Sequence, residues 1–98
     1  MIFIFENKKY ITRGVNENVI PLLQVFMWEC IENMPHSKDY LQVFELAKEK
    51  EKLKITHSQE QPPYKKEYLI KTDAPFYVGK IFIIDDESHA TMLLAEEY

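Results

Sequence analysis

The side chains best suited to chemistry in this sequence are those of His57 and Gln59. Residues two apart in an extended strand share a face, so the two side chains are expected to point the same way. An imidazole held near an apolar wall has a shifted pKa and can serve as an acid or base. The sequence pairs no nucleophile with it, which favours a histidine at the edge of the core, bonded to a backbone carbonyl.

Arg13 is the third polar candidate. In an extended segment its stem would lie along apolar surface and its guanidinium at the rim, where it could grip a carboxylate or a phosphate. An ion pair with an acidic residue such as Glu96 or Glu97 is the favoured interpretation. A small-ligand-binding protein or an enzyme remains the alternative hypothesis, and it requires Arg13, His57 and Gln59 to converge.

Two other features could be taken for a metal site and for a reactive thiol, but the sequence favours neither interpretation. Asp85-Asp86-Glu87 with His89 lacks the alternating ligands and the glycine of an EF-hand loop, so turn formation is favoured. Cys30 is the single cysteine and falls in an apolar helical stripe, where it reads as a small hydrophobe. The sequence therefore predicts no metal site and no cofactor.

A basic stretch in the middle of the chain suggests nucleic-acid binding at first sight. Residues 46–72 contain seven basic and four acidic side chains, a net charge of +3, whereas residues 73–98 have a net charge of −5. Phosphate contacts dominate such affinity, and glutamates dilute the positive field. Weak nucleic-acid binding is therefore a minor hypothesis, based on Lys48, Lys50, Lys52, Lys54, Lys65 and Lys66 with Tyr64 and Tyr68.

The elements that must position these side chains indicate a single α+β domain over residues 1–98. Connections are short, and only the helical segment could support a parallel crossover. We therefore expect a mostly antiparallel, twisted sheet of about six or seven strands with one amphipathic helix packed on it. The expected strands are Ile2–Phe5 and Tyr10–Val15 as a first hairpin, then Tyr40–Ala47, Lys52–Ser58, Tyr64–Lys71, Val78–Ile84 and Thr91–Glu96.

The expected helix, Pro21–Asn33, is apolar around most of its circumference. One apolar stripe suffices for packing on a sheet. A second stripe, formed by Leu22, Val25 and Trp28, must be covered by loops of this chain or by another molecule. The leading hypothesis is therefore a non-enzymatic protein-interaction module, which binds an unknown protein or a second copy through this face.

Composition places the chain in a reducing cytoplasm rather than in or across a membrane. Hydrophobic residues make up 46% of the 98, enough for an ordinary core. The apolar start Met1–Phe5 is too short for a signal peptide, and no apolar run approaches the length of a membrane span.

Several segments together make the chain resemble a known family, the domain of unknown function 960. The resemblance implies a small cytosolic protein of Gram-positive bacteria, and it supplies no activity, ligand or catalytic residue. It runs over essentially the full length and is carried by Tyr10–Gly14, Pro21, Trp28, Tyr40–Leu46, His57–Glu60, Ile81–Asp86 and, most specifically, Thr91–Tyr98.

Overall fold

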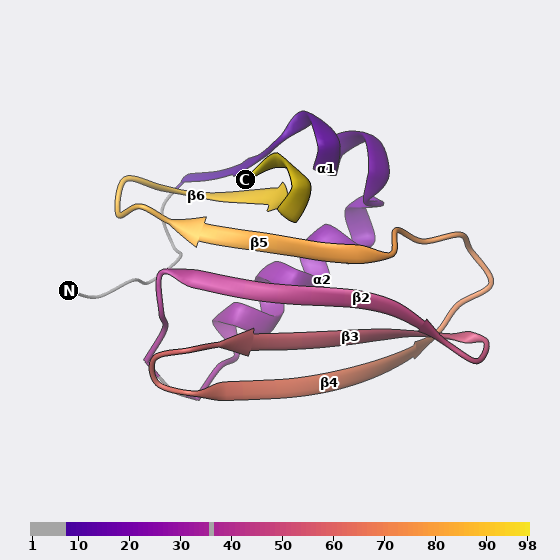
Figure 1. The fold of residues 1–98 in the computed structure, drawn as a ribbon. Helices are drawn as coiled ribbons and strands as arrows, with labels where there is room; N and C mark the ends of the chain where they lie inside the picture. The colour runs from indigo at the N-terminus through magenta and orange to yellow at the C-terminus, as the bar shows by residue number, and fades with distance from the viewer. Residues whose placement is uncertain (1–7, 36) are drawn as a thin grey trace.

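The computed structural model describes residues 8–35 and 37–98. Six strands form one mixed sheet in the order β1-β6-β5-β2-β3-β4, and α2 crosses behind it in Figure 1. The elements are β1 (Lys8–Ile11), α1 (Arg13–Asn18), α2 (Pro21–Glu32), β2 (Leu41–Glu49), β3 (Lys52–Gln59), β4 (Tyr64–Lys71), β5 (Gly79–Asp85), β6 (His89–Leu94) and the 3-10 turn η1 (Ala95–Glu97).

The core lies between α2 and the face of the sheet that α2 covers (Figure 1). Every second residue of β2, β3 and β5 points into it, because side chains alternate between the two faces of a strand. Burying each large aliphatic side chain stabilises the fold by about 2 kcal/mol. The fully buried apolar residues include Val15, Met27, Ile31, Phe44, Ile55, Ile81, Ile83, Ala90 and Met92.

The main helix begins and ends where local signals favour it. Pro21 occupies the first turn of α2, where a missing backbone N–H has no cost. The helix ends at Glu32, and Asn33 follows as its C-terminal cap. At 12 residues α2 is about 18 Å long. Among the described residues, no helix has the length and apolarity needed to cross a bilayer.

The α+β class is confirmed, but the expectation of a mostly antiparallel sheet is wrong. The sheet is mixed and has six strands, because β1 pairs with β6 in parallel, with Tyr10 opposite Thr91. The chain leaves β1 through α1 and α2, builds β2–β5, and returns as β6 beside its starting strand. This long excursion supplies the crossover that a parallel pair requires.

The predicted strand over Tyr10–Val15 is also wrong beyond Ile11, because α1 begins at Arg13. Thr12 caps this helix: its hydroxyl oxygen accepts a hydrogen bond from the Val15 backbone N–H. The capping contact overrides the strand preference of the surrounding residues. The proposed partner strand of that hairpin, Ile2–Phe5, lies outside the described residues.

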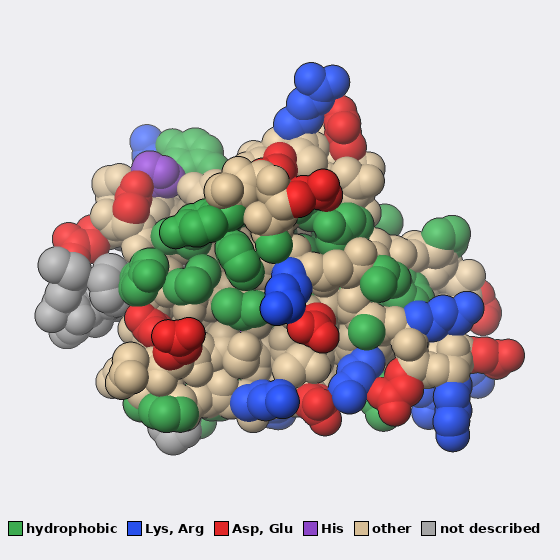
Figure 2. Space-filling view, viewed as in Figure 1, with side chains coloured by type: hydrophobic (Ala, Val, Ile, Leu, Met, Phe, Trp, Pro, Cys, Tyr) green, Lys and Arg blue, Asp and Glu red, His purple; other side chains and the backbone are tan. Residues whose placement is uncertain are grey.

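The face of the sheet that α2 leaves open has two different halves, both visible in Figure 2. Apolar side chains gather over β5, β6 and the neighbouring end of β2, and the Tyr98 ring packs edge-on against Phe82 with ring centroids 5.6 Å apart. Charged side chains of both signs cover the other half, over β3 and β4. The apolar half consists of Leu41, Val43, Phe82, Ile84 and Leu93.

Candidate functional site

His57 is completely buried on the α2-facing side of β3. Its ring stacks on the cross-strand neighbour Phe44, with centroids 4.3 Å apart and an interplanar angle of 9°. The Tyr64 ring meets it edge-on at 5.4 Å. The imidazole is therefore enclosed by aromatic rings and does not border a surface cleft lined by reactive groups.

Gln42, on β2, joins His57 to Gln59. The Nε2 of His57 lies 2.6 Å from the Gln42 Oε1, and the Gln42 amide nitrogen donates to the Gln59 Oε1 at 2.7 Å. His57 and Gln59 thus share one face, as the alternation predicts, but the partner of the histidine is a side-chain amide rather than a backbone carbonyl. We call these three residues the buried network.

The hydrogen bonds fix the protonation of the imidazole. Because the Gln42 nitrogen donates to Gln59 and to the Asp39 carbonyl oxygen, its Oε1 faces His57 as an acceptor. The His57 Nε2 must therefore carry the hydrogen, which leaves Nδ1 as an acceptor without a donor among the described residues. Burial lowers the pKa of His57 to about 4, so the ring is neutral at physiological pH.

Gln59 extends the buried network to two connecting segments. Its amide nitrogen donates to the carbonyl oxygens of Ser37 and Pro62, at 3.0 and 2.8 Å. Its Oε1 accepts the Asp39 backbone N–H at 2.9 Å. The α2–β2 connection and the β3–β4 turn are thereby fastened to β3, so the network supports the half of the sheet that ends in β4.

Arg13 does not join His57 and Gln59. It lies in α1, which contacts β6 (Figure 1), and its side chain is 89% exposed. Its guanidinium pairs with Glu17, one helical turn away, with 2.8 Å between Nε and Oε1. The expected ion pair with an acidic residue is therefore present, but its partner is Glu17 rather than Glu96 or Glu97, because the helix brings Glu17 within reach.

Glu97 has a different role, at the start of α1. Its carboxylate accepts hydrogen bonds from the Thr12 hydroxyl at 2.6 Å, the Leu94 backbone N–H at 2.8 Å and the Gly14 backbone N–H at 3.1 Å. These bonds, the Thr12 hydroxyl first, lower the pKa of Glu97. A Cβ on Gly14 would lie 2.7 Å from the carboxyl atoms, so the glycine allows this close approach. We call this set of contacts the Glu97 clamp.

The predicted interaction face on α2 is divided in the structure. Leu22 and Val25 are 75% and 52% exposed. Trp28 is instead partly buried against the core, and the Lys9 Nζ lies 5.6 Å from its ring centroid. Lys9 belongs to β1, at the edge of the sheet far from β4, and its side chain covers part of the tryptophan ring. Trp28 is therefore partly covered by this chain itself.

Leu22 and Val25 border a shallow groove of about 340 Å³ between α2 and β4. The partly buried side chains of Phe26 and Ile70 form part of its apolar lining. Glu29 is the single charged residue among those that line it. We call this feature the α2–β4 groove, and Leu23 completes its lining.

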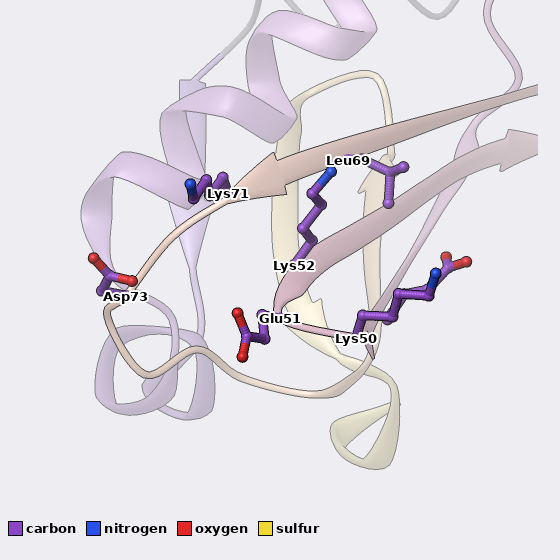
Figure 3. A pocket seen from close by; sticks show the side chains of 7 residues that line it. Lys50, Glu51, Lys52, Leu69, Lys71 and Asp73 are labelled. Carbon is purple, nitrogen blue, oxygen red and sulfur yellow. The ribbon is translucent and has the colours of Figure 1, made fainter.

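A larger concavity, of about 700 Å³, lies between the β2–β3 turn and the segment after β4 (Figure 3). Its lining is charged, with Lys50, Lys52 and Lys71 among acidic neighbours. In Figure 3 Lys50 points away from Asp73, so the charged groups do not converge on one centre. This arrangement is typical of a solvated surface.

Two lysines of the open face, Lys54 and Lys80, are paired with carboxylates. The Lys54 Nζ lies 3.3 Å from the Glu67 carboxylate and 3.6 Å from that of Glu49, and Lys80 lies 4.0 Å from Glu45. Such pairing reduces the positive field available to a phosphate backbone. It gives no support to nucleic-acid binding through the central strands.

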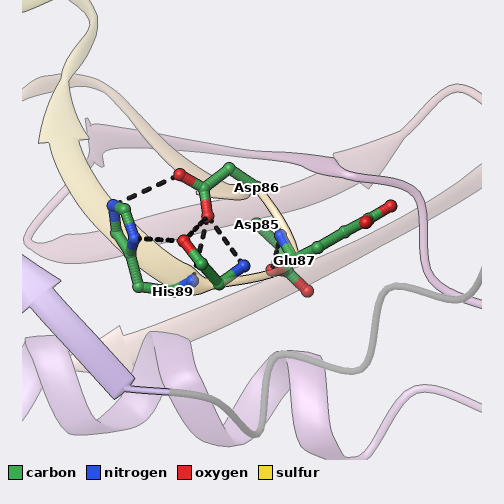
Figure 4. Close-up of polar contacts among 5 residues, drawn as sticks. Asp85, Asp86, Glu87 and His89 are labelled. Atoms are coloured by element: carbon green, nitrogen blue, oxygen red, sulfur yellow. Dashed lines mark hydrogen bonds and ion pairs between the residues drawn. The ribbon is translucent and has the colours of Figure 1, made fainter.

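In the acidic turn between β5 and β6, the Asp86 carboxylate contacts other residues of the same turn (Figure 4). One Asp86 oxygen accepts from the Ser88 backbone N–H and hydroxyl and from the His89 backbone N–H, and the other lies 3.3 Å from the His89 Nε2. These hydrogen bonds lower the pKa of Asp86. Glu87 points away from this carboxylate in Figure 4, and no three potential ligands among the described residues could hold a metal.

Comparison with known proteins agrees with this fold over nearly all of the chain. A family model described as a Staphylococcal protein of unknown function (DUF960) matches residues 8–97. The chain belongs to the DUF960 family. The resemblance noted in the sequence is thereby confirmed.

One solved structure has the same fold. It is described as the crystal structure of the protein of unknown function from Enterococcus faecalis, and it superposes with a TM-score of 0.85 over 100% of this chain and 98% of that chain. The two sequences are 22% identical, so the similarity shows the fold alone. No curated protein matches the sequence.

Sequence reasoning missed two residues that define these sites. Gln42 shares the inward face of β2 with Phe44 and Leu46, and a polar residue at this inward position was a detectable signal of a buried polar partner. Ile70 completes the α2–β4 groove through the sheet order, which brings β4 to the edge beside α2. No local pattern contains that order.

Proposed function

We propose that this protein is a non-enzymatic protein-interaction module that binds a partner protein through the exposed side of α2. The exposure of Leu22 and Val25 carries the proposal. Single exposed aliphatic residues are ordinary, but these two adjoin Phe26 and Ile70 in one apolar groove. Contiguous apolar surface beside a helix is typical of a protein-binding site.

Charge favours a different protein over a second copy of this chain. Glu29 and Glu32 follow the exposed aliphatic residues along α2, and the helix Pro21–Glu32 contains no lysine or arginine. Two copies packed through α2 about a two-fold axis would bring these carboxylates into the interface without a cation on the facing helix. A heterologous partner can supply apolar side chains without that cost.

The buried network supports a non-enzymatic role. His57 is enclosed by aromatic rings, its Nε2 is bonded to Gln42, and Arg13 lies elsewhere in the fold. A general base must reach the proton that it removes, either directly or through one water. The enzyme hypothesis needed these side chains in one accessible pocket.

Site-specific photo-crosslinking tests the proposed surface. We expect a photoreactive residue at position 22 to capture one protein in the source cells, and one at the similarly exposed Val78 to capture none. The captured protein is then purified, and its affinity is measured for the wild type, Val25→Asp and the matched control Val78→Asp. Val25→Asp should weaken binding at least about tenfold, as expected for the centre of an interface.

Equal binding by both aspartate variants, with both still folded by circular dichroism, would rule out this surface. Capture of only a second copy of the chain would replace the hetero-association with self-association.

A further inference from the structure

The outer side of β4 is an unpaired edge among the described strands. All eight residues of β4 pair in continuous register with β3, so the strand is regular along its whole length. A regular edge strand presents a row of free backbone N–H and C=O groups, to which an extended peptide can bind as an added strand. The opposite edge strand, β1, has four residues in the part of the chain that the structure describes.

The α2–β4 groove runs beside this same edge. Tyr68 and Ile70 of β4 point toward the side of α2, and Ile70 lines the groove with Leu22 and Val25. A strand added to β4 would place every second side chain on this face, and those opposite Ile70 would lie beside the groove. Backbone pairing and apolar contact would then act on the same peptide.

The edge also has unbalanced positive charge. Within the described part of the chain, no carboxylate forms an ion pair with Lys65, Lys66 or Lys71, whereas Glu67 is held by Lys54 at 3.3 Å. Register places Lys65 and Lys71 on the open face, because they share a face with Glu67. Acidic side chains on that face of an added strand would complement them.

We propose that β4 binds an extended acidic segment of the partner protein as an additional strand. Its alternate apolar side chains lie in the α2–β4 groove, and its acidic side chains face Lys65 and Lys71. This inference rests on the proposed function and names the segment that the surface recognises. A nucleic acid fits less well, because its negative backbone would also meet Glu29 in the groove.

The test uses a defined probe, the blocked octapeptide with four alternating Glu-Val pairs, and isotope-labelled full-length protein. We expect saturable NMR shifts at alternate β4 amides and at the Leu22 and Val25 methyl groups, and weaker binding at higher salt. The Lys-Val analogue and a twelve-residue oligothymidylate serve as charge and nucleic-acid controls.

Paired charge reversals give a matched comparison. Lys65→Glu with Lys71→Glu should weaken peptide binding at least about tenfold, since two complementary charges become repulsive. Lys8→Glu with Lys48→Glu makes the same change in net charge away from the β4 edge, and should leave the affinity within about twofold.

Several outcomes would overturn strand addition. These are equal binding of the Lys-Val peptide, no saturable shift at about 2 mM peptide, oligothymidylate shifts at β4 without peptide shifts, or β4-to-β4 contacts between two copies. A partner that crosslinks at position 22 yet leaves the β4 amides unprotected from hydrogen exchange would also overturn it, while leaving the proposed function intact.

Discussion

Near the β1 edge of the sheet, an exposed carboxylate holds two segments of the chain together. The β4 half of the sheet is instead stabilised by neutral polar groups that are buried. The Glu97 clamp joins η1 to the start of α1 through hydrogen bonds at the surface. The buried network joins Gln42, His57 and Gln59 where water is excluded. The two edges therefore differ in what holds them and in what they leave free.

Because of this difference, the contacts that stabilise the β4 half of the sheet lie away from the edge that is open for binding. A surface carboxylate can replace its protein hydrogen bonds with bonds to water, so removing it lowers the stability only modestly. When a buried polar group loses its hydrogen-bond partner, the folded state is destabilised by the full desolvation free energy of that group. The buried network fastens the connections around β3 and β4 from inside, so the outer side of β4 can remain open without weakening the fold.

The largest expected effect is at Gln42. Gln42→Leu removes the acceptor for His57 and one of the two donors to the Gln59 Oε1, so the buried Nε2–H of His57 is left unsatisfied. We expect the free energy of unfolding to fall by about 2–4 kcal/mol in urea titrations. The control Gln61→Leu, at an exposed position, should change it by less than about 0.5 kcal/mol. Equal stability of the two variants would contradict the role of the network.

The next effect is the dependence of stability on pH through His57. Its pKa is about 4 in the folded protein and 6.5 in the unfolded chain, so the unfolded chain binds the proton first as the pH falls. The contribution of the neutral His57 to stability is therefore present above pH 6.5 and is lost progressively between pH 6.5 and 4. From pH 7 to pH 5 the loss should be about 2 kcal/mol.

Urea titrations of wild type and His57→Gln at both pH values measure this contribution. The variant has no titrating group at position 57, so its stability should change far less between pH 7 and pH 5. A wild-type slope that persists in His57→Gln would assign the effect to other groups.

A smaller effect is the coupling between Gly14 and Glu97. Alanine is a better helix former than glycine, but its Cβ would displace the Glu97 carboxylate. In a Glu97→Ala background, Gly14→Ala should stabilise the protein by about 0.5–1 kcal/mol. In the wild type the same substitution should gain less or destabilise. A double-mutant cycle with no coupling would show that Glu97 does not limit the side chain at position 14.

The smallest effect is expected at the exposed side of α2. Leu22→Asp should change the unfolding free energy by less than about 0.5 kcal/mol, because Leu22 is 75% exposed. Leu23→Asp, one residue along and 7% exposed, should unfold the protein. If Leu22→Asp also unfolded the protein, the groove would be a structural feature rather than a free surface.

Periodicity in the sequence was enough to predict the main helix and most strands. Pro21 marked the start of α2, and the alternation in Tyr64–Lys71 gave the bounds of β4. The same alternation placed His57 and Gln59 on one face. These features depend on neighbours in the chain, which a single sequence displays.

The rest depends on contacts between distant residues. The start of α1 is held by Glu97, more than eighty residues away, so the strand-like residues before it misled the prediction. The parallel pairing of β1 with β6 and the position of β4 beside α2 follow from sheet order. The division of Trp28 from Leu22 and Val25 likewise depends on where Lys9 lies.

The pairing of Lys8 with His89 also has a consequence for the order in which the chain acquires structure. The β2–β3–β4 meander closes through short turns as soon as its residues are available. β1 must wait for β6, and closing so long a loop costs more entropy than closing a turn. During vectorial synthesis the first described strand therefore becomes the last to find its neighbour.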